Sequence, residues 1–184
     1  MKILVTGGLG FIGSALIRHL IANTKHKILN IDNITYAAMP EALAQIENDE
    51  DYAFEKIDIT SEKSLKQAFT IFKPDAVIHL AAESHVDRSI DAPAEFMKTN
   101  ILGTYNLLQA SRDTWSSSLE EKRFLHVTTD EVFGSLKQKD KPFTEENKYY
   151  PNSPYAASKA SSDHLVRAWH KTYNLPILVT NCSN

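Results

Sequence analysis

A tyrosine and a lysine stand four residues apart in the segment Tyr155-Ala-Ala-Ser-Lys159. On a helix, this spacing places both side chains on the same face. An ammonium group close to a phenol stabilises the phenolate and lowers the pKa of the tyrosine, so the phenol becomes a candidate base near neutral pH. Such a pair also arises by chance on helix surfaces, so its meaning depends on the surrounding elements.

Two neighbouring acids, Asp130 and Glu131, directly follow Thr128 and Thr129. Two carboxyl groups can divide the duties of acid and base when their surroundings push their pKa values apart. The alternative interpretation is a solvated pair on a loop. A second polar stretch, Glu83 to Ser89, could contact a substrate, although a structural or hydrogen-bonding role competes with catalysis for its histidine, His85.

A glycine-rich segment, Thr6-Gly-Gly-Leu-Gly-Phe-Ile-Gly13, separates an apolar run from a helical pattern. The segment fits G-x-G-x-x-G with Gly8, Gly10 and Gly13, and it also fits G-x-x-G-x-x-G with Gly7, Gly10 and Gly13. Missing side chains let the backbone approach a pyrophosphate, and the N-terminus of the following helix favours negative charge. The alternative is a tight strand-to-helix turn that holds no ligand.

Asp32 follows Gly13 by 19 residues, at the end of the second predicted strand. This spacing is typical of an acid that binds the ribose hydroxyls of a dinucleotide. A carboxylate there repels a 2′-phosphate, which favours NAD over NADP, whereas the alternative is a simple turn residue. Two weaker signals for the same cofactor are Asp58-Ile59 and Leu80-Ala81-Ala82. The first could equally be a strand-end turn, and the second could equally reflect close packing in the core.

Short apolar runs alternate with helical patterns along the chain. We predict strands at residues 2–6, 27–31, 52–57, 75–82, 123–128 and 175–180. We predict helices at residues 11–22, 40–48, 61–72, 93–114 and 153–173, with Ser61 as an N-cap and Pro74 as a stop. Strands that are apolar throughout and separated by helices indicate parallel βαβ units covered on both faces. The sequence therefore predicts an α/β fold, a doubly wound parallel sheet of the Rossmann type.

The composition narrows the class of protein further. The chain has 184 residues, which favours one domain, and a net charge of −3, which disfavours general attraction to nucleic acid or anionic membranes. A single cysteine, Cys182, excludes an intrachain disulfide and a cysteine-based zinc site. No apolar run is long enough to span a membrane. We expect a cytoplasmic protein without a metal site.

Together, the glycine-rich segment, Asp32 and the Tyr155/Lys159 pair resemble the extended short-chain dehydrogenase/reductases. Within that group, three strings are similar to the dTDP-glucose 4,6-dehydratase family: Ala81-Ala-Glu-Ser-His-Val-Asp-Arg-Ser-Ile90, Thr129-Asp-Glu131 and Thr180-Asn-Cys-Ser-Asn184. The similarity covers essentially the whole chain. Related sugar-nucleotide epimerases share the glycines and the Y-x-x-x-K motif but generally lack the Asp-Glu pair.

The resemblance implies NAD as the cofactor and dTDP-glucose as the substrate. It implies substrate contacts from Ser84, Thr129 and Asn184. It implies pyrophosphate contacts from the backbone of Phe11 and Ile12, and further cofactor contacts from Gly7, Gly10, Gly13, Asp32, Asn33, Ile34, Thr35, Asp58, Ile59, Leu80, Ala81, Ala82, Ser84, Thr99, Tyr155 and Lys159.

The resemblance also implies a mechanism. Tyr155, supported by Thr129, would take the proton of the sugar C4 hydroxyl while hydride moves from C4 to NAD. Glu131 would then remove the C5 proton, and Asp130 would protonate the departing C6 hydroxyl. Return of the hydride to C6, with reprotonation of C5, would give dTDP-4-keto-6-deoxyglucose, so the enzyme would be a hydro-lyase.

Members of this family are about twice as long as this chain, and their second half supplies most of the substrate domain. We therefore expect residues 1–184 to be an NAD-binding Rossmann domain from which most of the C-terminal substrate domain is missing. Weakened NAD binding and little or no turnover by the chain alone are expected, because remote binding energy positions the reacting carbon. Homodimers would pair through the helices predicted at residues 93–114 and 153–173.

Three other functions stay open on the sequence alone. The chain could belong to another enzyme of the same fold, such as a UDP-sugar epimerase or a different nucleotide-sugar dehydratase. It could be a non-catalytic NAD-binding module. It could also be an inactive fragment.

Overall fold

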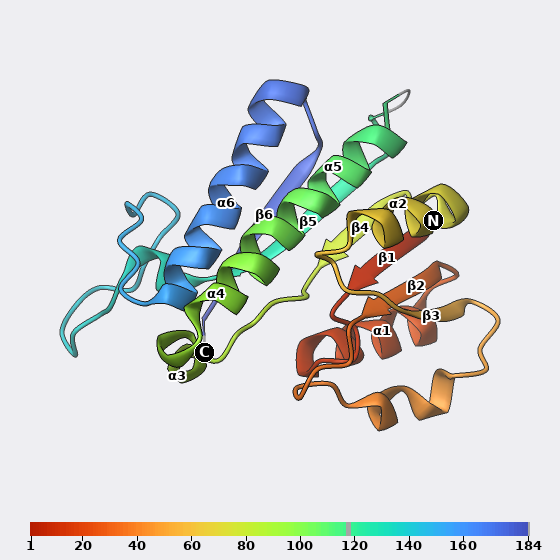
Figure 1. The fold of residues 1–184 in the computed structure, drawn as a ribbon, viewed down its shortest axis with the longest axis horizontal. Coiled ribbons are helices and arrows are strands. Elements are labelled where there is room, and N and C mark those ends of the chain that lie inside the picture. The colour runs from red at the N-terminus through yellow and green to blue at the C-terminus, as the bar shows by residue number, and fades with distance from the viewer. Residues whose placement is uncertain (117–118, 184) are drawn as a thin grey trace.

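The computed structural model describes residues 1–116 and 119–183, which contain a six-stranded, all-parallel sheet (Figure 1). The strand order is β3-β2-β1-β4-β5-β6, so the predicted doubly wound, Rossmann-like sheet is confirmed. The strands are β1 (Lys2–Thr6), β2 (Lys27–Asp32), β3 (Tyr52–Lys56), β4 (Ala76–His79), β5 (Arg123–Thr129) and β6 (Ile177–Cys182).

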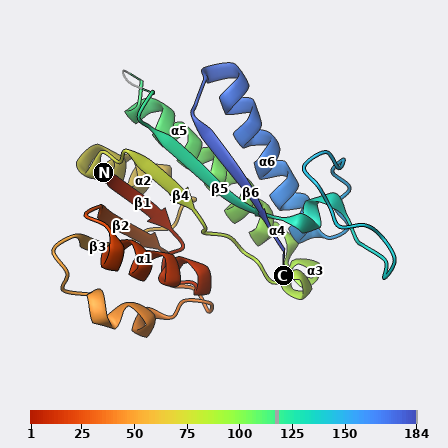
Figure 2. The ribbon, with the colours of Figure 1, turned by 180° about the vertical axis from the view of Figure 1, so that it is seen from behind.

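Helices lie on both sides of the sheet. The helices α2, α5 and α6 cover one face, and α1 covers the other, as Figures 1 and 2 show from opposite sides. The α-helices are α1 (Phe11–Asn23), α2 (Glu62–Phe72), α3 (Val86–Asp91), α4 (Pro93–Phe96), α5 (Thr104–Thr114) and α6 (Pro154–Tyr173). Two 3₁₀ helices, η1 (Pro40–Ile46) and η3 (Asp130–Phe133), and a π-helical segment, η2 (Met97–Gly103), complete the set.

Each face of the sheet carries its own apolar core. Side chains alternate along a strand, so Ile3 and Val5 of β1 pack with Ile17 of α1, while Leu4 packs on the opposite face. That opposite core contains Leu65 of α2 together with residues from α5 and α6. Burial of this apolar surface is the main force that fixes the helices on the sheet.

The expectation that every strand is buried on both faces is wrong for the two edge strands. Four of the five residues of β3, and five of the six of β6, are exposed. In Figure 2 no helix of the described residues lies in front of β5 and β6. An edge strand has a neighbour on one side only, so an apolar run such as Ile177-Leu-Val does not ensure burial.

The long helix predicted at residues 93–114 forms as three segments, α4, η2 and α5. Its middle is wound more widely because Asn100 turns inward to bond with the backbone of Glu83 and with Ser158. Thr104 also donates to the Asn100 carbonyl at 2.6 Å. The wide turn brings Gly103 against Ile59, where a Cβ atom would lie 2.5 Å from Cδ1. Wide turns of this kind occur often at functional sites.

Other boundaries differ in smaller ways. The Ser61 N-cap is confirmed, since its hydroxyl accepts a hydrogen bond from the Ser64 N–H. The predicted strand at residues 75–82 ends at His79, and the following residues run in an irregular path to α3, a short helix that the pattern did not predict. Helix 40–48 is a 3₁₀ helix, η3 was not predicted, and the last strand begins two residues later than expected.

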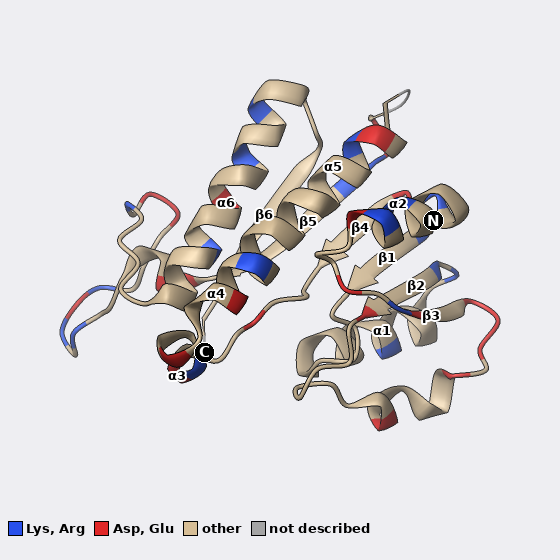
Figure 3. Ribbon diagram, in the orientation of Figure 1, with Lys and Arg blue, Asp and Glu red and all other residues tan. Residues whose placement is uncertain are grey.

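Charged side chains of both signs are distributed over the molecule. In the view of Figure 3, the loop before β3 is acidic and the loop at residues 137–141 is mostly basic, and neither sign dominates. This distribution agrees with the small net charge of −3. Within the described residues, no helix is both long enough and apolar enough to cross a lipid bilayer.

Candidate active site

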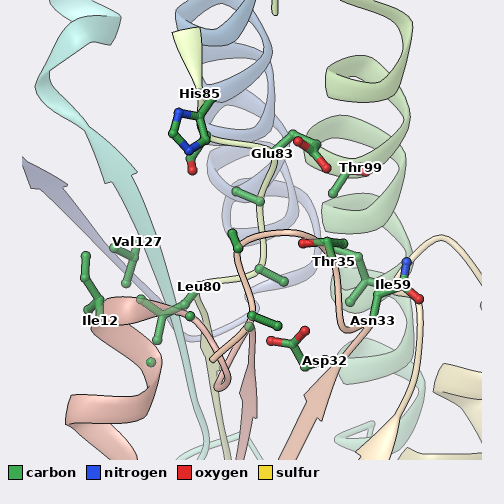
Figure 4. Close-up of a pocket in the computed structure, with 18 of the residues that line it drawn as sticks. Ile12, Asp32, Asn33, Thr35, Ile59, Leu80, Glu83, His85, Thr99 and Val127 are labelled. Atoms are coloured by element: carbon green, nitrogen blue, oxygen red, sulfur yellow. The ribbon is translucent and has the colours of Figure 1, made fainter. Parts of the chain in front are cut away.

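A cavity of about 610 Å³ opens at the carboxyl ends of the strands. It lies where the sheet order turns from β1 to β4, the switch point at which ligands bind in doubly wound folds. In Figure 4, Asp32, Asn33 and Thr35 lie on one side of this cavity and Val127 on the other. The volume falls within the range of small-molecule sites.

The glycine-rich turn forms one end of the cavity. Gly7 has a φ of +71°, and a Cβ atom on it would lie 2.6 Å from the backbone nitrogen of Ala81. A side chain at Gly13 would collide with the Gly7 carbonyl. Both glycines are therefore required for the strand, the turn and the helix to pack this closely.

Helix α1 points its N-terminus into the same end. Its N-cap is Gly10, which offers no side chain, and a Cβ atom there would meet only the Gly7 carbonyl, at 3.3 Å. The first N–H groups of a helix lack intrahelical partners and carry partial positive charge. Phe11 is 82% exposed and lines the cavity together with Ile12, so this backbone is open to an anion.

Asp32, at the end of β2, is held by backbone donors. Its carboxylate accepts from the N–H of Leu9 at 3.1 Å and from that of Ile34 at 2.8 Å. These bonds aim the carboxylate at the cavity and leave acceptor capacity for further donors. Beside it, the Asn33 amide donates to Asp58 at 3.1 Å, which joins the ends of β2 and β3.

The far end of the cavity is formed by α6 and β5. Tyr155, Lys159 and Thr129 all line it, and Ser153 caps α6 by accepting from the Ala156 N–H. The Lys159 ammonium donates to the Val127 carbonyl at 2.8 Å. Burial lowers the pKa of Lys159 to about 8, against the opposing charge of Asp163.

The phenol of Tyr155 does not behave as the spacing predicts. Burial and the negative charge of Glu131 raise the pKa of Tyr155 to about 12, and a hydrogen bond with Thr129 opposes them. The expected net lowering of the Tyr155 pKa is therefore wrong for this structure. The physical reason is that the ammonium is directed at the Val127 carbonyl while the phenol is largely removed from water.

The two neighbouring acids sit on the short helix η3 just beyond β5. Thr129 caps this helix by accepting from the Glu131 N–H at 3.2 Å. Burial, followed by the adjacent charge of Asp130, raises the pKa of Glu131. A raised pKa suits a carboxyl group that exchanges protons near neutral pH.

The structure brings most of the candidate residues together. Those that line the cavity are Gly7, Gly10, Phe11, Ile12, Gly13, Asp32, Asn33, Thr35, Asp58, Ile59, Leu80, Ala81, Ala82, Ser84, Thr99, Thr129, Tyr155 and Lys159. Ile34, Asp130 and Glu131 do not line it. Asn184 lies outside the described residues.

Sequence reasoning missed several polar residues of this region. Glu95 and Lys98 line the cavity, and Asn100 ties the segment after β4 to α6. Glu83 and His85, from the polar stretch that the sequence singled out, also line the cavity. Asp163, one helical turn beyond Lys159, was also overlooked, although its spacing on α6 was a usable signal. Within residues 1–116 and 119–183, no cluster of three His, Cys, Asp or Glu side chains is placed to hold a metal ion.

Comparison with known proteins agrees with this geometry. Residues 4–184 match the model of the family described as GDP-mannose 4,6 dehydratase. The chain belongs to this family. The resemblance seen in the sequence strings is also confirmed, because the curated relatives include a dTDP-glucose 4,6-dehydratase of Shigella flexneri that is 56% identical over the whole of this chain.

Solved structures of dehydratases and epimerases share the fold of this chain. The dTDP-glucose 4,6-dehydratase DesIV of Streptomyces venezuelae, solved with NAD bound, has a TM-score of 0.90 and 42% identity over 99% of this chain. A UDP-glucose 4-epimerase of Thermotoga maritima, solved with UDP-glucose, has a TM-score of 0.86 and 31% identity over 98%. The chain covers 54% of the Shigella relative and 55% of each structure, about half of their length.

Proposed function

We propose that residues 1–184 form the NAD-binding part of a dTDP-glucose 4,6-dehydratase, which converts dTDP-glucose into dTDP-4-keto-6-deoxyglucose and water. The observation that carries the proposal is a single cavity with a dinucleotide-type turn at one end and Thr129, Tyr155 and Lys159 at the other. The 56% identity to a relative of that name supports the choice of reaction.

The residues at the glycine-rich end fit NAD. The bare N-terminus of α1 at Gly10 matches a pyrophosphate, and the Asp32 carboxylate matches a pair of ribose hydroxyls. A 2′-phosphate would meet that carboxylate at close range, so NAD fits better than NADP. Asn33, Ile34, Thr35, Asp58 and Ile59 would surround the adenosine, and Tyr155 and Lys159 would hold the nicotinamide ribose.

When bound, NAD supplies a reversible acceptor for hydride. Tyr155 would take the proton of the sugar C4 hydroxyl, and Thr129 would support the phenolate through its hydroxyl. Lys159 would favour the phenolate by its charge. Because the phenol alone has a pKa of about 12, this proton transfer depends on the surroundings that substrate and cofactor create.

The acids on η3 would carry out the loss of water. Glu131, whose pKa is raised by burial, would accept the C5 proton once C4 is a ketone. Asp130 would protonate the C6 hydroxyl as it leaves. Ser84, Thr129 and Asn184 would contact the substrate, and these three positions come from the family resemblance.

Calorimetric titration with NAD, combined with incubation with dTDP-glucose in deuterated water, tests this proposal. We expect NAD binding, together with exchange of the C5 proton and slow formation of the 4-keto-6-deoxy sugar. Glu131→Gln should abolish C5 exchange and leave NAD binding unchanged. Absence of NAD binding, or inversion at C4 without C5 exchange, would overturn the proposal, and the latter result would favour an epimerase.

We also propose a homodimer and a cytoplasmic location. Exposed apolar side chains on the helices expected to pair, Leu102 and Tyr105, support the dimer, and Trp169 and Tyr173 of α6 continue the same strip through ring contacts. Light scattering coupled to size exclusion tests it. Tyr105→Glu should reduce the mass to that of the monomer, whereas an unchanged monomeric mass in both proteins would refute the dimer.

A further inference from the structure

The inner face of α6 carries three polar side chains at regular spacing. Tyr155, Lys159 and Asp163 follow one another at intervals of four residues, which aligns them along one side of the helix. Lys159 and Asp163 are 5% and 4% exposed. Among the described residues they are the buried members of the Lys, Arg, Asp and Glu group, so the two opposite charges share one apolar interior.

Asp163 is held by three donors from two other parts of the chain. One oxygen accepts from Nε2 of His126 at 3.0 Å. The other accepts from the Thr128 hydroxyl at 3.1 Å and the Tyr149 hydroxyl at 2.9 Å. These three hydrogen bonds hold the Asp163 carboxylate in a fixed position.

Strand β5 binds both charges of α6. The backbone carbonyl of Val127 takes the Lys159 ammonium, while its neighbours His126 and Thr128 take Asp163. Three consecutive strand residues therefore fix the register between the strand and the helix. The end of that strand is Thr129, which hydrogen-bonds the Tyr155 phenol.

The charges around Lys159 come from every adjacent element. Asp163 and Cys182 raise the pKa of Lys159, against the larger effect of burial. His126 of β5 and His79 of β4 have pKa values lowered by burial, so both rings are neutral near pH 7. Glu131 acts on Tyr155 from η3. Asp163 is the buried acidic residue of this set, one helical turn from Lys159 along α6.

We propose that Asp163 is a positioning residue whose fixed, buried carboxylate keeps the Lys159 ammonium charged and directed at the carboxyl end of β5. The role rests on the proposed function of Lys159 beside the nicotinamide ribose. It extends the Tyr155/Lys159 pair to a row of three residues, of which Asp163 does not line the cavity. Without its anion, burial would favour a neutral lysine, which stabilises a phenolate poorly.

The test measures the pKa of Lys159 directly, from the pH dependence of its amine modification followed by peptide mass spectrometry. Asp163→Asn keeps the shape and removes the charge, and we expect it to lower the pKa of Lys159 by about one unit or more. Tyr149→Phe removes one donor but keeps the carboxylate, so it should leave the value near 8. Asp163→Glu keeps the charge and should therefore preserve the pKa of Lys159 at least in part.

An unchanged Lys159 pKa in folded Asp163→Asn would overturn the proposal, whatever the activity of the chain. If that variant does not fold, unfolding of the chain gives a second measurement. Lys159→Met with Asp163→Asn should then fold better than Asp163→Asn alone, since neither charge is left without its partner. A double variant no more stable than that single variant would contradict the pairing. Loss of NAD binding with an intact pKa shift would instead count against the proposed function.

Discussion

The two halves of the sheet are built differently. At β1 and β2, apolar cores pack against both faces of the sheet, and four of the six residues of β2 are buried apolar or amide side chains. In the half formed by β5 and β6, helices cover one face, and no residue of β6 is buried. The glycine-rich end of the cavity thus rests on apolar packing, whereas the end formed by Tyr155 and Lys159 depends on the hydrogen bonds around Asp163 and Asn100.

The largest effect is expected at Tyr155, beside the half of the sheet formed by β5 and β6. Tyr155→Phe removes the proposed base and should slow reduction of bound NAD by dTDP-glucose roughly 10²- to 10⁴-fold. Single-turnover absorbance of the reduced cofactor measures this rate. Tyr173→Phe, on the outer end of the same helix, is the control and should leave the rate unchanged. An equal loss in both variants would show that α6 tolerates neither change.

Apolar packing provides a direct comparison of the two halves. Ile31→Ala, at a fully buried position of β2, should lower the free energy of unfolding by about 2–5 kcal/mol. Leu178→Ala, at a β6 position that is 54% exposed, should cost under about 1 kcal/mol. Denaturant titration of both variants measures the difference. Similar losses at the two positions would mean that β6 is packed as tightly as β2.

The buried lysine makes stability depend on pH. The pKa of Lys159 is lowered to about 8 in the folded chain from 10.5 in the unfolded one, so the unfolded state binds more protons between these values. The contribution of Lys159 therefore rises with pH from 8 to 10.5 and is lost as pH falls through 8. Thermal unfolding of the wild type, compared with Lys159→Met, should show this rise only in the wild type. If stability depends on pH in the same way in both proteins, folding does not lower the pKa of Lys159.

The smallest effect is expected at the cofactor end. Asp32→Ala should weaken NAD binding by about 1–2 kcal/mol, because a carboxylate that accepts from ribose hydroxyls is lost. Calorimetry measures the change, and Asp91→Ala on α3 serves as a charge-matched control. An NADP affinity that does not improve in Asp32→Ala would contradict the idea that this carboxylate repels a 2′-phosphate.

The sequence predicts the half of the sheet with β1 and β2 better than the half with β5 and β6, for a physical reason. The glycines, Asp32 and the Ser61 cap act through contacts close in the chain or through strand order, so local patterns reveal them. The wide turn at Asn100 arises from bonds to Glu83 and Ser158, far away in the sequence. The direction of the Tyr155 pKa shift likewise depends on burial and on Glu131, which spacing along one helix does not contain.

The wide turn at residues 97–103 has a consequence for how the chain tolerates changes in length. Asn100 bonds two separate segments, and Gly103 fits against Ile59, only at this rotation of the helix. Adding or deleting one residue there would turn both positions by about 100° around the helix axis. This stretch of helix must therefore keep its residue count.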